Sequence, residues 1–294
     1  MSYRYTFTVF TPTFNRIHTL PRVYDSLKVQ TFRDFEWLIV DDGSTDGTGM
    51  LVERWKHEAN FSIRYYWQEN RHKKVAFNKG VQLAEGKFFF GVDSDDALFP
   101  DSLEILYNEW LRIPEREKEE FAGVRGLCQY SSGTIVGSLF PKDHIDSNQL
   151  ELRLKYKVTG DKCGFTRTSV LKHFPFPEQF FGHVPESVIW TPIGKRYKTR
   201  YINRVLYKVH QDGKDRITRV FKPDAHAPGH LYWMKIELDI ALSFFIYAPI
   251  HFLLIAARWT RFWLHIKEPT SMNQFFPRHS GARILVLLMV PLGI

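Results

Sequence analysis

Short apolar runs alternate with amphipathic segments over the first third of the chain. Each of these runs is rich in β-branched and aromatic residues, which predicts a strand. The predicted strands are YTFTVF (5–10), FEWLIV (35–40), IRYYWQ (63–68) and KFFFGV (87–92). FEWLIV is typical of a strand that is buried on both faces of a sheet.

The segments between these runs have the spacing of helices. Thr19 and Pro21 mark a helix start, and further helices are predicted over 50–57, 75–86 and 100–111. Strands that alternate with helices predict right-handed βαβ units and a mostly parallel sheet with flanking helices. The sequence therefore predicts an α/β, Rossmann-like fold.

Polar residues follow three of the predicted strands directly, as TPTFN (11–15), DDGS (41–44) and DSDD (93–96). In open parallel sheets, ligands bind outside the carboxyl ends of the strands. Close carboxylates repel one another, so the DSDD segment is expected to have a positively charged partner. No GxGxxG follows a strand and no GxxxxGK[ST] occurs, which removes the main support for a dinucleotide or P-loop site.

One other motif fits the same region. Asp42, Ser44, Asp46, Gly47 and Glu53 have the spacing of a calcium-binding EF-hand loop. An EF-hand needs a helix before the loop, whereas FEWLIV predicts a strand there. We therefore interpret this match as a coincidence.

Composition places the chain among ordinary globular proteins, with 44% hydrophobic and 24% charged residues in 294. Its two cysteines, Cys128 and Cys163, lie far apart, which argues against a disulfide framework or zinc site and favours a reducing compartment. The N-terminal residues show no signal-peptide pattern. These features predict a cytoplasmic protein.

The net charge of +8 is concentrated between residues 195 and 222, where ten Lys and Arg stand against two Asp. Such a segment indicates an anionic partner or simply a solvated basic face. No zinc, RRM-like or helix-turn-helix signature accompanies it, so nucleic acid is not the predicted partner.

Apolar residues dominate the C-terminal part of the chain. Residues 240–257 contain no Asp, Glu, Lys or Arg, and a second apolar run covers 284–294. Basic residues alternate with Trp and Phe between the two runs, a composition typical of the membrane interface. We favour helices that lie in the cytoplasmic leaflet, while a spanning helix and a buried core helix remain open alternatives.

Two long stretches carry a family resemblance. Residues 9–48, from VFTPTFNR to DDGSTDGT, resemble the opening of the family 2 glycosyltransferases, which have the GT-A fold. Residues 68–104, from QENRHKK to DSDDALFPDSLE, resemble their second half-site with its DxD motif. The resemblance covers roughly residues 5–210. It implies a GT-A catalytic domain over 1–222. The apolar and basic composition of the tail, which lies outside the resemblance, predicts a membrane-associated helical region over 223–294. Because the alternating strand–helix core is complete before residue 231, a chain lacking residues 231–294 should still fold.

The resemblance also implies a donor site for a nucleoside-diphosphate sugar, most simply a UDP-sugar. Asp42 would accept a hydrogen bond from the nucleobase, although a turn residue before Gly43 explains Asp42 equally simply. The remaining donor-site residues implied by the family pattern are Thr11, Pro12, Thr13, Phe14, Lys73, Lys74, Asp93 and Ser94.

A divalent cation is expected beside the donor diphosphate, because Mn²⁺ and Mg²⁺ prefer carboxylate oxygens and stabilise a departing diphosphate. By the family pattern Asp95 would be the direct ligand, with Asp93 and His210 completing the set. Asp96 fits either a supporting role or a helix N-cap.

Inverting transfer needs a general base for the acceptor hydroxyl. Related enzymes place an acidic pair there, and this sequence has Glu186 followed by Ser187. Glu186 is therefore the candidate base and His183 the second choice, unless Glu186 only pairs with the basic segment.

Together these features predict an inverting, metal-dependent glycosyltransferase at the cytoplasmic face of the membrane. Its acceptor would be a lipid-linked saccharide, such as one carried by polyprenyl pyrophosphate in surface-polysaccharide assembly. A polyprenyl-phosphate glycosyltransferase and a catalytically silent nucleotide-sugar-binding protein are the alternatives.

Overall fold

The computed structural model describes residues 3–180, 182–211, 223–263, 266 and 272–290. Its contacts define two compact units. Among the described residues, the first unit comprises 3–147, 158–175 and 197–211. The second comprises 148–157, 176–196 without 181, and the residues from 223 onward. The predicted boundary at residue 222 lies outside the described residues and stays a prediction.

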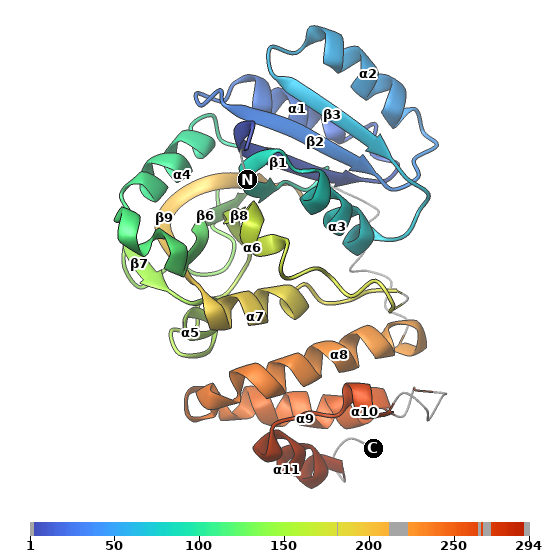
Figure 1. Cartoon of the computed structure of the whole chain (residues 1–294), viewed down its shortest axis with the longest axis vertical. Coiled ribbons are helices and arrows are strands. Elements are labelled where there is room, and N and C mark those ends of the chain that lie inside the picture. The colour runs from blue at the N-terminus through green and yellow to red at the C-terminus, as the bar shows by residue number, and fades with distance from the viewer. Residues whose placement is uncertain (1–2, 181, 212–222, 264–265, 267–271, 291–294) are drawn as a thin grey trace. The chain divides into compact units, whose positions relative to one another are not determined.

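The first unit is built on a nine-stranded sheet with the strand order β3-β2-β1-β4-β8-β6-β9-β5, and β7 pairs with β9 (Figure 1). The strands are β1 (Tyr5–Thr13), β2 (Phe35–Asp41), β3 (Ser62–Trp67), β4 (Gly86–Gly91), β5 (Ala97–Leu98), β6 (Phe121–Tyr130), β7 (His144–Ser147), β8 (Lys162–Arg167) and β9 (Lys198–Val209). The first four of these are the strands that the sequence pattern predicts.

The expectation of a mostly parallel sheet holds for only half of this sheet. β3, β2, β1 and β4 are mutually parallel, and β6 is parallel to β9. The pairs β4–β8, β6–β8, β5–β9 and β7–β9 are antiparallel. Helices also lie between β5 and β6, between β7 and β8, and between β8 and β9, but none of these successive strands pair with each other, so alternation in the sequence does not make this half parallel.

Helices cover both faces of the parallel half. They are α1 (Leu20–Lys28), α2 (Thr48–Glu58), α3 (Lys73–Leu83) and α4 (Ser102–Leu111). Apolar residues of α1, α2 and α4 share one core cluster with Phe7 and Val9 of β1. Successive strand residues point to opposite faces, and Phe10 accordingly packs against Phe77 of α3, with ring centroids 5.8 Å apart.

A glycine lets α3 approach the sheet closely. A Cβ atom on Gly80 would lie only 2.3 Å from the ring of Phe10. The remaining elements of this unit are the short helix α6 (Thr168–Leu171) and the 3₁₀ helix η1 (Glu115–Glu120). Both cysteines are buried and free.

The described part of the second unit is helical. It contains α5 (Gln149–Leu154), α7 (Ser187–Arg196), α8 (Pro223–Ala241), the 3₁₀ helix η3 (Leu242–Tyr247), α9 (Pro249–Trp263), α10 (Met272–Phe275) and α11 (Ser280–Met289). α8 contacts both α7 and α9, and α9 contacts α11. Segments that are distant in the sequence, 148–157 and 176–196, thus share this unit with the C-terminal helices.

The apolar run 240–257 does not form one helix. α8 ends at Ala241, η3 follows, and α9 begins at Pro249, whose ring removes a backbone donor. Phe252, Ile255 and Ala256 of α9 are buried. In the part of the chain that the structure describes, no helix is both long and apolar enough to cross a membrane.

Part of the basic segment 195–222 is neutralised within the fold. Lys198 pairs with Glu120 at 2.8 Å, and Arg200 makes two hydrogen bonds with Asp146, at 2.8 and 2.7 Å. Residues 212–222 lie outside the described residues. The charge excess of β9 is therefore smaller than the sequence count suggests.

Candidate active site

The polar segments after the parallel strands meet at one edge of the sheet. Strand register aligns Thr13 of β1 with Asp41 of β2, and Asp41 with Trp67 of β3. On the other side of β1, Phe10 aligns with Gly91 of β4. The loops that begin at residues 14, 42, 68 and 92 therefore leave the sheet along the same edge, which is where the sequence places the candidate site.

The two aspartates of DDGS have different roles. Asp41 is fully buried, and its carboxylate accepts hydrogen bonds from the Ser44 N–H and the Tyr65 hydroxyl, both at 2.7 Å. Asp42 instead accepts two hydrogen bonds at Oδ1, from Gln68 Nε2 at 2.7 Å and the Arg71 N–H at 2.9 Å. Asp41 therefore accepts the hydrogen bond within the turn, whereas the Asp42 carboxylate bonds to the segment after β3.

The TPTF segment divides into buried and exposed residues. Thr11 is fully buried, and its hydroxyl accepts a hydrogen bond from the Trp37 indole at 3.0 Å, which places its side chain in the core. Thr13 is also buried, whereas Pro12 is half-buried and Phe14 is exposed. Phe14 is thus the residue of this segment that could stack against a base, and Thr11 could only support the wall from behind.

Lys73 neutralises part of the acidic turn after β4. Its Nζ lies 2.9 Å from Asp93 Oδ1. The charge of Lys73 lowers the pKa of Asp93, burial opposes this shift, and the guanidinium of Arg16 adds to it. Arg22 also reaches this turn, donating a hydrogen bond to the Asp95 carbonyl at 3.2 Å.

Asp96 is buried under this turn. Its Oδ1 accepts a hydrogen bond from the His210 N–H at 2.8 Å, and the Tyr207 hydroxyl accepts one from the Asp93 N–H at 2.9 Å. Burial raises the pKa of Asp96 to about 7, with the charges of Asp93 and Asp95 adding to the shift. The N-cap alternative for Asp96 is wrong, because residue 101 caps α4 and Asp96 precedes β5.

The acidic turn suits a divalent cation. Three carboxylates crowd into four residues, and a bound cation would reduce the repulsion between them. Hard oxygen donors of this kind suit Mn²⁺ and Mg²⁺. Among the described residues, no group of three or more His, Cys, Asp or Glu is arranged to hold a metal ion. Asp93, Asp95 and His210 therefore stay predicted ligands, and the EF-hand match gains no support.

Comparison with known proteins settles the family. The description "Glycosyl transferase family 2" matches residues 8–170, which is more than half of the chain. This chain belongs to family 2 of the glycosyltransferases. The matched region includes every element that contributes to the acidic sheet edge except β9.

Two curated relatives are similar to most of this chain. A GalNAc(5)-diNAcBac-PP-undecaprenol beta-1,3-glucosyltransferase of Campylobacter jejuni is 28% identical over 74% of this chain and 66% of its own length. The glycosyltransferase GlyA of Streptococcus pneumoniae is 25% identical over 71% of this chain and 26% of its own length. The chain thus spans about two thirds of the first relative and about a quarter of the second.

Solved structures support the GT-A fold. Staphylococcus aureus TarS, solved with UDP-GlcNAc, superposes with a TM-score of 0.64 at 19% identity, covering 97% of this chain and 82% of TarS. A mannosyltransferase of Pyrobaculum calidifontis, solved with GDP-Man and Mn²⁺, gives a TM-score of 0.50 at 17% identity, covering 99% and 81%.

The remaining predicted site residues lie in both units. Ser94 and Lys74 of the first unit are buried. Glu186 and His183 belong to the second unit, where Glu186 is exposed directly before α7. The backbone N–H of His183 donates to His226 Nδ1 at 3.0 Å. Their roles in catalysis stay predictions.

Several residues of the site do not stand out in the sequence pattern. Gln68 and Arg71 donate hydrogen bonds to Asp42. Both lie in QENRHKK, directly after β3, and their position at the end of a strand could have identified them as site residues. Arg16 and Arg22 follow TPTFN closely. Tyr207 lies 114 residues from Asp93, so no local pattern could connect the two.

Proposed function

We propose that this glycosyltransferase transfers a sugar from a UDP-sugar to a saccharide carried by a membrane polyprenyl pyrophosphate. The observation that carries the proposal is the meeting of Asp42 and the Asp93–Asp96 turn at one sheet edge, beside Lys73. Asp42 suits a nucleobase N–H, and the Asp93–Asp96 turn with Lys73 suits the diphosphate and its cation.

The donor half of the proposal follows from the free hydrogen-bonding capacity of Asp42. Gln68 and Arg71 both donate to Oδ1, which orients the carboxylate and directs Oδ2 to a further donor. The uracil ring offers such an N–H. Lys73 and Arg16, which lower the pKa of Asp93, supply positive charge for the diphosphate.

In the proposed reaction, Glu186 takes the proton of the acceptor hydroxyl while the acceptor oxygen attacks the anomeric carbon in line. The bond from that carbon to the diphosphate oxygen breaks, and the nucleoside diphosphate leaves with the bonding electrons. A bound Mn²⁺ or Mg²⁺, held by Asp95 and Asp93, would supply Lewis-acid stabilisation of the leaving group. Inversion of configuration follows from a single displacement.

The acceptor half rests on the Campylobacter relative, whose name gives an undecaprenol-linked acceptor, and on the apolar C-terminal helices. Under this proposal the enzyme acts at the cytoplasmic face of the membrane.

A donor panel tests the proposal. We expect calorimetry to detect binding of a UDP-sugar in the presence of Mn²⁺, and transfer to a polyprenyl-pyrophosphate-linked saccharide to follow. In Asp42→Asn the amide would meet the uracil N–H, and we expect roughly tenfold weaker binding or worse. A protein that binds the donor but never turns it over would instead be the silent binding protein.

A further inference from the structure

The second unit exposes large apolar side chains in its C-terminal helices. Ile246 of η3 is 77% exposed and Ile250 of α9 is 70% exposed. On α11, Ile284, Leu287 and Leu288 are 59%, 60% and 65% exposed, while Ala282 and Val286 of the same helix are buried. α11 therefore carries apolar side chains on both its packed and its exposed sides, whereas an ordinary surface helix has a polar exposed side.

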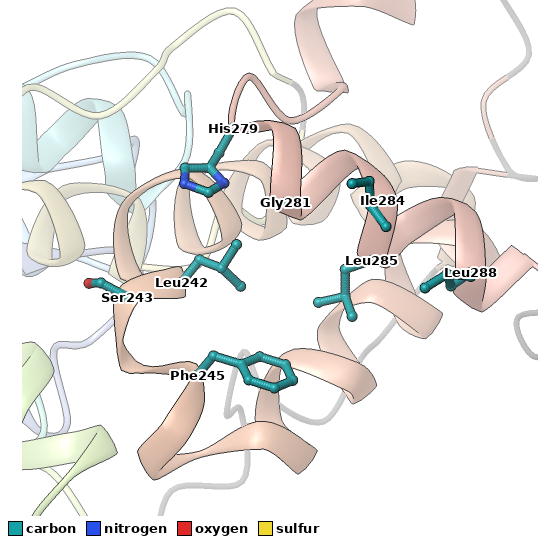
Figure 2. A pocket seen from close by; sticks show the side chains of 8 residues that line it. All are labelled: Leu242, Ser243, Phe245, His279, Gly281, Ile284, Leu285 and Leu288. Carbon is teal, nitrogen blue, oxygen red and sulfur yellow. The ribbon is translucent and has the colours of Figure 1, made fainter.

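A groove connects two of these elements. Residues of η3 and α11 line a cavity of about 460 Å³. Its walls are Leu242, Ser243 and Phe245 of η3, His279, and Gly281, Ile284, Leu285 and Leu288 of α11. Figure 2 shows Leu242, Phe245 and Leu285 pointing into the space between the two elements. Because Ile284 and Leu288 are more than half exposed, the apolar groove is open to its surroundings.

Positive charge accompanies this apolar surface. After Asp239 the sequence contains five Lys or Arg and a single acidic residue, Glu268. Within the described residues, Arg258 and Arg261 of α9, Arg278, and Arg283 of α11 are exposed. Like charges would oppose the packing of two such faces against each other, whereas anionic headgroups would complement them.

We propose that η3, the start of α9 and α11 form a face that inserts into the interface of an anionic lipid bilayer. Lipid chains would fill the groove and cover Ile246, Ile250 and Leu288, while the arginines contact headgroup phosphates. The inference deepens the proposed function, since a lipid-linked acceptor is carried by the same bilayer. It assigns membrane contact to this face and not to the whole apolar run 240–257.

Vesicle binding by the full chain tests this face. We expect the protein to sediment with vesicles of phosphatidylcholine and phosphatidylglycerol, and more weakly with phosphatidylcholine alone. The double variant Ile284→Asp/Leu288→Asp should lower partitioning by roughly tenfold or more, since it removes two exposed apolar side chains that the lipid would cover. Arg258→Gln/Arg261→Gln should weaken binding to the anionic vesicles only, by about fivefold per charge. The contribution of these two charges to binding should diminish as the salt concentration rises.

The matched control is Leu111→Asp, which places the same charge at a leucine that is 52% exposed on α4 of the first unit. It should leave partitioning unchanged. UDP binding and thermal melting check that each variant is folded. Equal partitioning of wild type and the α11 double variant would overturn the proposal. So would a wild-type dimer that the α11 substitutions dissociate, because a second copy would then occupy the face.

The readout separates this inference from the proposed function. Donor turnover without vesicle binding would contradict the proposed membrane-binding face and support the transferase activity. Vesicle binding without donor turnover would support the face and contradict the transferase.

Discussion

At the scale of single residues, the acidic turn shows how charge is distributed for binding. Lys73 compensates Asp93, and burial keeps the pKa of Asp96 near 7, so the turn carries less charge than its sequence suggests. Asp95 is half-exposed. It is accordingly the carboxylate best placed to meet a cation from solvent.

Asp95→Asn should therefore abolish binding of Mn²⁺ in the presence of UDP and with it metal-dependent transfer, because an amide oxygen is a much weaker ligand. Isothermal calorimetry with Mn²⁺ measures this. The fold should persist, since removal of one of three crowded charges does not destabilise the turn. Asp101→Asn, outside the acidic turn, is the control and should bind as wild type does. Unchanged Mn²⁺ affinity in Asp95→Asn would refute the metal assignment.

Glu186 gives the second prediction at this scale. Glu186→Gln should bind the donor normally but transfer roughly 10²–10⁴-fold more slowly, the usual loss for a missing general base. Binding and single-turnover rates are measured on the same preparation. Glu178→Gln, at another glutamate of the second unit, should retain transfer. A collapse of donor affinity in Glu186→Gln would instead assign Glu186 to the donor site.

At the scale of elements, one buried carboxylate joins the helices of the second unit. Glu237 of α8 is fully buried and accepts hydrogen bonds from Arg153 of α5, from Thr191 of α7 at 3.0 Å, and from His251 of α9 at 3.1 Å. His251, which interrupts the apolar run in the sequence, thus has a structural role. The cluster fixes four helices around one charge.

This cluster should make the second unit sensitive to acid. Burial by itself would raise the pKa of Glu237, but the His251 hydrogen bond and the charge of Arg153 lower it below its usual 4.5. The unfolded chain then binds more protons than the folded chain below pH 4.5, so stability present above that pH is lost as the pH falls.

Glu237→Gln should lower the free energy of unfolding by roughly 3–5 kcal/mol at pH 7, since it leaves Arg153 without its counter-charge. It should also flatten the dependence of the melting temperature on pH below 4.5. Thermal melts across this range measure both. Glu53→Gln, which removes only an exposed pair with Lys56, should melt as wild type does. Identical acid profiles for wild type and Glu237→Gln would contradict this account.

At the scale of the whole molecule, the division into units changes the expectation for truncation. The sequence predicts that a chain without residues 231–294 folds by itself. In the structure, α7 packs on α8, and Leu231, Met234 and Leu238 of α8 are buried. A cut before α8 would therefore strip the partners from α5 and α7, which precede it in the chain.

We expect a chain that ends at residue 222 to aggregate and to bind a hydrophobic dye, whereas one that ends at residue 279 should stay monodisperse and bind UDP. Size-exclusion chromatography with light scattering compares the two. A monodisperse, UDP-binding 1–222 chain would show that the predicted domain boundary is right after all.

Sequence alone determined the parallel half of the sheet and the identity of its acidic edge. A local sequence pattern predicts a strand or helix where neighbouring residues share one environment. The apolar runs FEWLIV and KFFFGV do so, and each is followed by a polar loop. Parallel strands then place Asp42 and Asp93 at the same edge without any further information, because the carboxyl ends of parallel strands lie on the same side of the sheet.

Only the tertiary structure decided which of these residues bond to which. Tyr207 of β9 and His210, directly after β9, bond to the acidic turn, and Glu237 accepts hydrogen bonds from three other helices. Such contacts join residues far apart in the chain, and their energies depend on burial and on distances that no local pattern encodes. The apolar run 240–257 was ambiguous for the same reason: its sequence specifies that side chains avoid water, and packing alone decides whether protein or lipid covers them.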